Sequence, residues 1–238
     1  MHKIVRTVPL VNRCDRLKRR LYAPPQWDND GAFIERLQRC VGPGAVVLDL
    51  GAGGGQKFPY ALKTRVAPDG EIIGADFDVR VRDNPLLHRG VVLESGELPF
   101  AEGTFDLVFT RYVLEHVADP ALFLAEVRRV LKPGGSFLFL TPNKWHYVCL
   151  AARCTPEAFH QFYNRRRGRH ETDTFPTVYR LNSRSVIRRN FRQAGFVEEE
   201  LTMRECCPNY LMLTVPSFLL GVAYERMVNA TDLLSGLL

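Results

Sequence analysis

The sequence predicts an α/β fold with a doubly wound, mostly parallel sheet of seven strands, the last of which is antiparallel. Short apolar runs alternate with helical patterns from residue 45 to residue 142, which is typical of βαβ units. A glycine-rich turn directly follows the first of those runs. The 238 residues, 46% hydrophobic and 24% charged, form an ordinary globular composition that can enclose a sizeable core.

The same composition excludes a disordered chain, a collagen-like fibre and a small disulfide-stapled protein. None of the six cysteines forms a C-x-x-C pair, and the vicinal pair Cys206-Cys207 is a poor start for a disulfide framework. We therefore expect reduced, mostly buried thiols and a cytoplasmic protein. No Cys/His cluster has the spacing of a zinc site.

Neither end of the chain resembles a membrane or export segment. Residues 1–21 are basic but lack the apolar core of a secretory signal, and no run approaches the roughly 18 apolar residues of a membrane span. The formal net charge of +6 suits anionic partners and simple solubility equally well.

The alternating region predicts five strands and the helices that connect them. Residues 29–41 precede the first strand and show apolar side chains at helical spacing, which indicates an amphipathic helix. Pro120 begins a second helix, and Pro133-Gly134-Gly135 ends it. The expected strands are 45–50, 71–76, 90–94, 105–110 and 136–141, and the expected connecting helices are 55–66 and 120–131.

Beyond residue 142 the sequence changes character. It predicts a helix over 183–194, capped by Asn182 or Ser183, and a closing antiparallel pair of strands. That pair would comprise residues 197–202 and 210–215. The predicted division of the chain is a helical cap at 1–43, an α/β core at 44–143, a helical insertion at 144–181, and the rest of the core with an apolar tail at 182–238.

The sharpest motif is the segment from Val46 to Gln56, where a strand ends in an acid and glycines stand at 51, 53 and 55. Glycines let the backbone turn tightly and approach a ligand, and the helix that follows presents unpaired N–H groups to it. Such a turn suits a nucleotide-like molecule, or it is simply a structural turn. A dinucleotide fingerprint would need a third glycine where Gln56 stands. The sequence also lacks a phosphate-binding P-loop and a nucleophile elbow.

Asp76 stands at the end of the second predicted strand, 25 residues after Gly51. A carboxylate in that place can accept hydrogen bonds from both hydroxyls of a ribose. The alternative is an acid in a surface turn, because Asp78 follows closely.

In this order the motifs resemble those of class I S-adenosylmethionine-dependent methyltransferases, of the type 11 group that includes enzymes of the ubiquinone pathway. The resemblance implies a Rossmann-like methyltransferase fold and S-adenosyl-L-methionine as cofactor. It covers residues 44–143. The matching segments are Leu48 to Gly55, the acid Asp76, Glu94 to Phe100, Phe105 to Val108, Val113 to Val117, and Arg129 to Gly135 followed by Thr141 to Asn143.

The resemblance also implies where the cofactor would lie against the first two strands. Gly51, Ala52 and Gly53 would lie against its methionine part. Asp49 would orient the amino group of that part, and Asp76 would hold the ribose.

Five further residues would complete the cofactor site. Phe77 would lie on the adenine. Glu94 would face the adenine amino group, and Ser95 would offer a backbone N–H to the ring. Thr110 and Arg111, at the end of the fourth strand, would flank the methionine chain near the sulfonium.

His116 is the first candidate for a general base, because it lies just beyond the fourth strand where the transferred methyl group should be. The alternative is that it braces the neighbouring helix. Four residues of the insertion are weaker candidates, each better read as part of a wall: His146, Tyr147, His160 and Tyr163.

Related ubiquinone-pathway O-methyltransferases hold magnesium through a Glu-x-x-Glu-His arrangement. Glu115 and His116 match it, but Tyr112 replaces the first glutamate. A hard cation prefers several oxygen ligands, so we expect no metal.

The expected activity is in-line methyl transfer to a small or lipid-like molecule, most simply to an oxygen. Carbon or nitrogen as the acceptor atom, a nucleic-acid substrate, a cofactor-binding relative without turnover, and a nicotinamide-dependent oxidoreductase are the alternatives. Nucleic acid is disfavoured, because residues 110–113 lack the Asn/Asp-Pro-Pro-aromatic sequence of base-amine methyltransferases.

The arginines of 165–169 either clamp a phosphate or carboxylate or form a solvated face. Residues 211–223 are apolar, and together with basic surface they are compatible with a peripheral contact with a membrane.

Overall fold

A computed structural model describes residues 13–22, 29–55, 61–147, 149, 176–212 and 214–230. The chain divides into two compact units. The first comprises Met1–Ala32 and Met203–Leu237, and the second comprises Phe33–Thr202 together with the last residue. The division falls within helix α2 (Asn29–Cys40).

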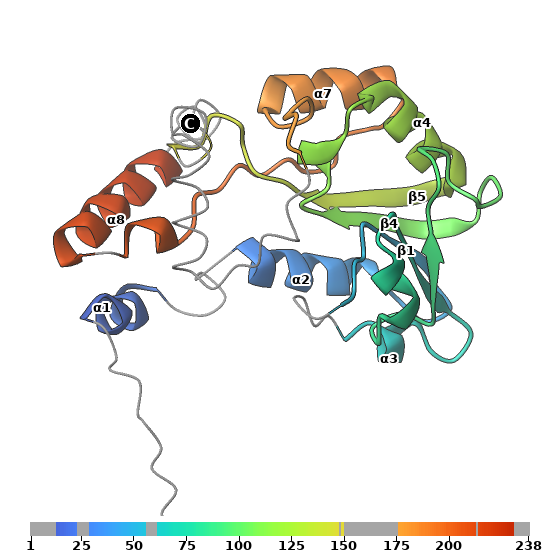
Figure 1. Ribbon diagram of the computed structural model, residues 1–238, viewed down its shortest axis with the longest axis horizontal. Helices are drawn as coiled ribbons and strands as arrows, with labels where there is room; N and C mark the ends of the chain where they lie inside the picture. The colour runs from blue at the N-terminus through green and yellow to red at the C-terminus, as the bar shows by residue number, and fades with distance from the viewer. Residues whose placement is uncertain are drawn as a thin grey trace, which may run out of the picture. The chain divides into compact units, whose positions relative to one another are not determined.

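The second unit contains a parallel sheet of five described strands in the order β3-β2-β1-β4-β5. Figure 1 labels the neighbouring strands β1, β4 and β5. Every neighbouring pair is parallel. The predicted doubly wound α/β fold is therefore confirmed. The strands are β1 (Val46–Leu50), β2 (Glu71–Asp76), β3 (Arg89–Val92), β4 (Phe105–Arg111) and β5 (Leu131–Leu140).

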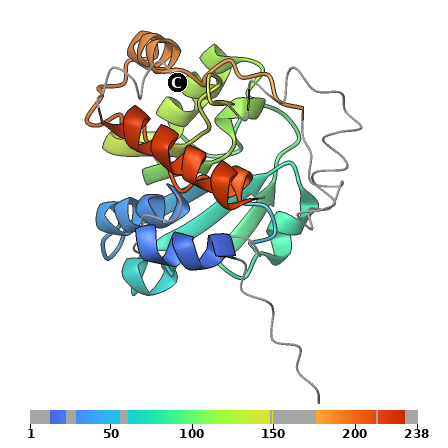
Figure 2. The same ribbon diagram turned by 90° about the vertical axis from the view of Figure 1, so that its left-hand side faces the viewer.

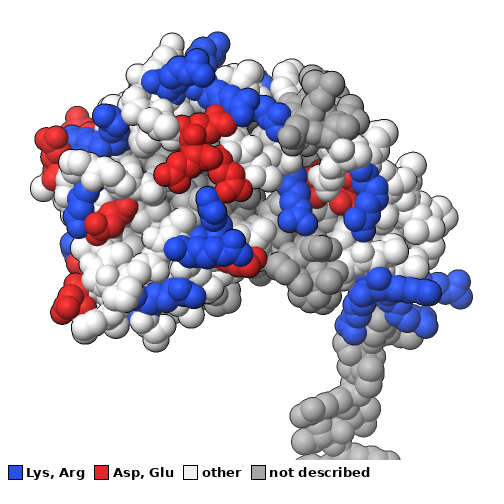
Figure 3. All heavy atoms as spheres, turned by 180° about the vertical axis from the view of Figure 1, so that it is seen from behind, with Lys and Arg blue, Asp and Glu red and all other residues white. Residues whose placement is uncertain are grey.

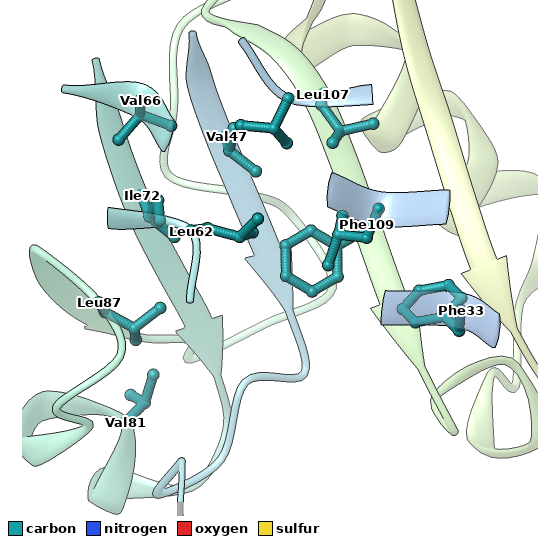
Figure 4. Packing of buried hydrophobic residues seen from close by; sticks show 11 residues of the cluster. Phe33, Val47, Leu62, Val66, Ile72, Val81, Leu87, Leu107 and Phe109 are labelled. Atoms are coloured by element: carbon teal, nitrogen blue, oxygen red, sulfur yellow. The ribbon is translucent and has the colours of Figure 1, made fainter. Parts of the chain in front are cut away.

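Helical elements cover both faces of this sheet. Successive residues of a strand point to opposite sides, so each strand contributes apolar side chains to both faces. On one face Val47, Ile72 and Phe109 pack with residues of α2, α3 (Lys63–Val66) and the 3-10 helix η1 (Val79–Asp83) (Figure 4). On the other face Leu48 and Ile73 pack with residues of α4 (Pro120–Val130). The sheet is thus buried on both sides, which explains its continuous apolar runs.

Helix α4 begins and ends where the sequence predicts. The Asp119 side chain accepts hydrogen bonds from the N–H groups of Ala121 and Leu122, and Pro120 occupies the first turn. Helix α7 (Arg184–Gln193) follows Ser183, one of the two predicted caps, although that side chain makes no capping hydrogen bond. Phe191 of α7 stacks on Phe137 of β5, with ring centroids 5.7 Å apart.

Strand β5 starts five residues earlier than expected. The backbone becomes extended at Leu131, directly after α4, and Leu131 pairs with Phe105. An irregularity in the ladder between Phe105 and Leu107 then accommodates the turn-forming residues 133–135. The helix has already ended at Val130, so residues 133–135 do not stop it as predicted; they lie inside the strand rather than before it.

The helix expected over 55–66 is shorter in its described part. Gly51 to Gly55 form a turn, residues 56–60 lie outside the description, and α3 starts only at Lys63. Three glycines with positive φ make a helical start within the loop unfavourable.

The predicted closing antiparallel pair is wrong for the described residues. Residues 197–202 form no strand, since Val197 is 90% exposed and three glutamates follow it. Residues 209–211 form a 3-10 turn, and Thr214 caps helix α8 (Val215–Asn229) through a capping box with Ser217. The described sheet therefore has five strands rather than seven.

The first unit is helical in its described part. Helix α1 (Arg13–Leu21) lies beside α8, as both ribbon views show (Figures 1 and 2). Cys14, Tyr22, Cys207 and Phe218 form its small core. The described cysteines are free thiols, and three of the five are buried.

Candidate functional site

The carboxyl ends of the five parallel strands share one edge of the sheet, and the strand order reverses between β1 and β4. In open α/β sheets ligands bind outside such a reversal, where two loops leave in opposite directions. Here those loops are residues 51–55 after β1 and residues 112–117 after β4. They contain Gly51, Ala52, Gly53 and His116 of the residues singled out from the sequence.

The three glycines with positive φ in the first loop differ in what a side chain at each position would meet. Gly51 has φ +88°, and a Cβ there would lie 2.2 Å from the Val113 side chain. Gly55 has φ +72°, and its Cβ would lie 2.1 Å from Oδ1 of Asn84. Gly53 has φ +52°, yet a Cβ there would meet no atom of the described residues within 4 Å. Packing therefore requires glycine at 51 and 55, whereas the described part of the chain leaves the space beside Gly53 open.

Two side chains hold this loop in place. Oδ2 of Asp76 accepts a hydrogen bond from the N–H of Gly53 at 2.8 Å, and its Oδ1 accepts one from Asp78. Asn84, which is buried, donates from Nδ2 to the carbonyl oxygens of Ala52 and Gly53 at 3.2 and 3.1 Å. Each carboxylate oxygen of Asp76 has a second lone pair. Asp76 can therefore brace the loop and still accept from a ligand.

The adjoining loops place the predicted adenine contacts. Phe77 follows β2 and is 59% exposed. Glu94 and Ser95 follow β3, the strand beside β2, and both are exposed. The Ser95 hydroxyl accepts a hydrogen bond from the N–H of Glu97.

Helix α4 fixes the loop that carries Glu94 and Ser95. Arg129 donates to the carbonyl oxygens of Leu98 and Phe100, and Glu126 accepts from the N–H of Leu98. The hydrogen bonds from Arg129 lower the pKa of Glu126. Arg129 is thus structural.

The ends of β1 and β4 hold the remaining predicted contacts. Asp49 and Thr110 are both buried. Among the described residues, the Thr110 hydroxyl oxygen is a buried polar atom without a hydrogen-bond partner. The guanidinium of Arg111 lies 5.3 Å from the ring centroid of Tyr112. Tyr112 has φ +57°, a conformation that costs a bulky residue about 1–3 kcal/mol and is often found at functional sites.

The second loop is tied to a segment about sixty residues later in the chain. Nδ1 of His116 lies 2.9 Å from the carbonyl oxygen of Pro176. The carbonyl oxygen of Glu115 accepts hydrogen bonds from the N–H groups of Val178 and Tyr179 at 2.8 and 3.1 Å. A carbonyl can only accept, so Nδ1 of His116 carries a proton, and Nε2 is the basic nitrogen of the neutral ring.

The Glu115 side chain reaches in the opposite direction, into the interior. Its Oε2 accepts a hydrogen bond from the Thr141 hydroxyl at 3.1 Å, and that hydroxyl accepts one from Nδ2 of Asn182 at 2.6 Å. Glu115 and Asn182 are both buried. Burial raises the pKa of Glu115 above its ordinary value, against the opposing effects of its hydrogen bonds and of His116.

The other acceptor-wall candidates are only partly described. His146 and Tyr147 follow β5, with their ring centroids 4.3 Å apart. His160, Tyr163 and the arginines of 165–169 lie outside the described residues. Among the described residues, no three His, Cys, Asp or Glu side chains are grouped to hold a metal ion.

The part of the chain that the structure describes contains no helix long and apolar enough to cross a membrane.

Sequence reasoning missed three contributors to this site: Asn84, Val113 and the pairing of Thr141 with Asn182. Asn84 lies 31 residues from the carbonyl group of Gly53 that it contacts, and Asn182 lies 41 residues from Thr141. The motif Thr141 to Asn143 was recognised, but its partner stands beyond the insertion, so no local signal could reveal it.

Part of this chain is similar to known methyltransferases. Residues 48–139 match the family described as a methyltransferase domain. An uncharacterised 37.1 kDa protein of transposon TN4556 from Streptomyces fradiae is 39% identical over 108 residues, which are 42% of this chain and 31% of that protein. The ubiquinone/menaquinone biosynthesis C-methyltransferase UbiE of Cupriavidus metallidurans is 36% identical over 115 residues, 45% of this chain and 47% of that protein. This chain therefore spans less than half the length of either relative.

The fold has solved counterparts. A SAM-dependent methyltransferase from Aquifex aeolicus superimposes with a TM-score of 0.51 over 80% of this chain and 92% of that one, at 21% sequence identity. At that identity the likeness concerns the fold.

Proposed function

We propose that this chain, whose residues 48–139 form a class I methyltransferase domain of type 11, transfers a methyl group from S-adenosyl-L-methionine to a small or lipid-like molecule. The observation that carries the proposal is the arrangement at the reversal of strand order. There an open glycine loop, a strand-end carboxylate and a histidine lie on the same edge of the sheet.

The described residues fit the proposed cofactor. The missing Cβ of Gly53 leaves open space beside a backbone that bends sharply. Asp76 keeps acceptor capacity for ribose hydroxyls, and Phe77 offers an exposed ring for the adenine. The buried Thr110 hydroxyl without a partner among the described residues lies at the end of β4, where the methionine part is expected. When bound, the cofactor supplies an activated methyl group, so the difficult electronics do not fall on the protein.

The protein then has to position the acceptor and, for a hydroxyl acceptor, to remove its proton. We assign proton removal to Nε2 of His116, because the Pro176 carbonyl holds the other ring nitrogen protonated. A base placed in this way contributes about 10²–10⁴-fold to the rate. Asp49, Gly51, Ala52, Glu94, Ser95 and Arg111 keep the cofactor-binding roles that the resemblance implies.

Oxygen is the acceptor atom that gives His116 a direct task. Carbon is the second candidate, because the curated relative is a C-methyltransferase. A histidine base would also serve carbon methylation of a phenol or quinol ring. Removing the hydroxyl proton activates the ring carbon, and after transfer the proton on that carbon is lost while the hydroxyl re-forms.

The test is to incubate the purified chain with S-adenosylmethionine that carries an isotopically labelled methyl group and with phenol and quinol acceptors. Release of S-adenosylhomocysteine shows turnover, and the NMR shift of the labelled product separates oxygen-bound from carbon-bound methyl. Calorimetry measures binding of the cofactor and, in parallel, of NADPH. Cofactor binding without turnover on any acceptor would favour a non-catalytic relative, and binding of NADPH alone would favour an oxidoreductase.

A further inference from the structure

The solvent face of α8 is apolar, which is unusual for a surface helix. Every residue of α8 is described, and Arg226 is its one exposed charged side chain. Leu219, Leu220 and Met227 are 46%, 71% and 52% exposed. Surface helices normally present charged and polar residues to water, whereas an all-round apolar helix has something covering it.

A buried carboxylate fixes which face of α8 points outward. Glu225 accepts hydrogen bonds from the Tyr22 hydroxyl at 3.0 Å and from Nδ2 of Asn229 at 2.7 Å. Phe218 and Val228 are buried on the same side of the helix. Because turning the helix would bury its leucines only by exposing this cluster, the apolar face is a stable feature of the first unit.

The neighbouring helix α1 supplies positive charge. It packs against α8 through Cys14, and Asp15 is its one acidic residue. Its exposed basic side chains are Arg13, Arg16, Arg19 and Arg20. In Figure 3 a group of Lys and Arg spheres lies over this helix, at the lower right. The apolar stripe of α8 therefore has a strongly basic neighbour in the same unit.

We propose that α1 and α8 dock the protein onto the surface of an anionic lipid bilayer. An interfacial helix buries its apolar face at the boundary of headgroups and acyl chains, and nearby arginines add attraction to anionic headgroups. The leucines of α8 and the arginines of α1 supply these two contributions. The proposal does not depend on the reaction proposed above.

A second copy of the chain fits this face less well. A stable interface buries about 800 Å² on each partner and involves roughly 20–30 residues a side. Three large apolar side chains fall short of that. A symmetric pairing through α8 would also bring two sets of arginines into the same region, with Asp15 as the single acidic residue of each α1.

The experiment is co-sedimentation of the full chain with phosphatidylcholine vesicles, with and without phosphatidylglycerol, at low and high salt. We expect binding to the anionic vesicles at least about tenfold tighter than to the neutral ones, and weaker at high salt because salt screens the arginines. Leu220→Glu, and separately the double variant R16E/R20E, should each weaken binding about tenfold or more. Two matched controls in the second unit, Val197→Glu and Arg189→Glu, replace exposed residues of the same types and should change nothing.

Each contrary outcome overturns the proposal. The wild-type chain could stay in the supernatant with every vesicle, or bind undiminished with Leu220→Glu. Light scattering could instead show a dimer that Leu220→Glu dissociates, which would assign the face to a second copy. A loss with Arg189→Glu but not with R16E/R20E would move the basic contact to α7. Circular dichroism of each variant ensures that a loss reflects the surface rather than the fold.

Discussion

The two sides of the strand-order reversal are built differently. On the β1 side, the glycine loop is held by Asp76 and Asn84, which stand 23 and 31 residues from the Gly53 groups that they contact. On the β4 side, His116 and Glu115 are held by partners about sixty residues away, near the end of the insertion. The first side is built from consecutive βα units, and the second from two distant segments.

The two sides therefore depend on different parts of the chain. The proposed cofactor side depends on a short contiguous stretch, so it can stay constant while the rest of the chain varies. The proposed acceptor side depends on residues 176–182, which join the insertion to the sheet. The same contacts that orient His116 therefore connect it to the segment expected to recognise the acceptor.

The largest expected effect concerns the glycines of the first side. Gly51→Ala should lower the unfolding free energy by about 2–5 kcal/mol, because it adds a clash with Val113 to the cost of a positive φ. Gly53→Ala bears only the conformational cost of about 1–2 kcal/mol. Urea denaturation measures both values.

Cofactor affinity separates the two glycines further. Gly53→Ala should weaken binding of S-adenosylmethionine about tenfold, because the added alanine Cβ would occupy the open space beside the loop. Calorimetry on the folded variant checks this, and an unchanged affinity would mean that no ligand approaches Gly53.

On the other side, His116→Ala should reduce turnover about 10²-fold or more while the cofactor affinity stays near that of the wild type. The reason is that His116 is expected to act on the acceptor proton and not on the cofactor. Steady-state kinetics and calorimetry together test this. Retained turnover with a lowered unfolding midpoint would assign His116 to bracing the loop instead.

Asp76→Ala should weaken cofactor binding at least about tenfold, because hydrogen bonds to a charged group contribute about 1.5–3 kcal/mol. Asp83→Ala removes an exposed acid of η1 and serves as the control for a general charge effect. Near-normal affinity in Asp76→Ala would refute the ribose assignment.

The smallest effect is a pH dependence on the β4 side. Because burial raises the pKa of Glu115 in the folded chain, the unfolded chain loses this proton first as pH rises above the ordinary value of 4.5. The unfolding free energy of the wild type therefore falls through that window. Glu115→Gln has no such proton, so its stability relative to the wild type should increase with rising pH and then level off.

Denaturation curves between about pH 4 and pH 8 measure this difference. Glu115→Ala is the contrast, because it also loses the hydrogen bond from Thr141, about 0.5–1.5 kcal/mol. A difference between Glu115→Gln and the wild type that does not change with pH would mean that Glu115 keeps an ordinary pKa in the folded chain.

By itself the sequence determined the parallel core and its motif. Apolar runs bounded by glycine and proline placed each of the first four strands to within two residues. A strand that is covered on both faces has mainly apolar side chains on both, so it appears in the sequence as a continuous apolar run. Asp119 and Pro120 likewise placed the start of α4 through purely local hydrogen bonds.

The C-terminal part was decided by tertiary structure. Residues 197–202 and 210–215 contain enough apolar residues to look like strands, but a strand forms only where a neighbouring edge pairs with it. A local signal was also overlooked there, since Thr214 and Ser217 form a capping box with Pro216 in the first turn of α8.

The candidate site divides in the same way. Gly51, Gly53 and Asp76 were predicted from their spacing and from the family resemblance. The structure brings them to one edge of the sheet, because consecutive βα units place consecutive strand ends there. Only the folded chain could show that Asn84 braces the loop, that Pro176 selects the tautomer of His116, and that Asn182 reaches Glu115 through Thr141. Those contacts join residues with no periodic relation in the chain, so packing in three dimensions decides them.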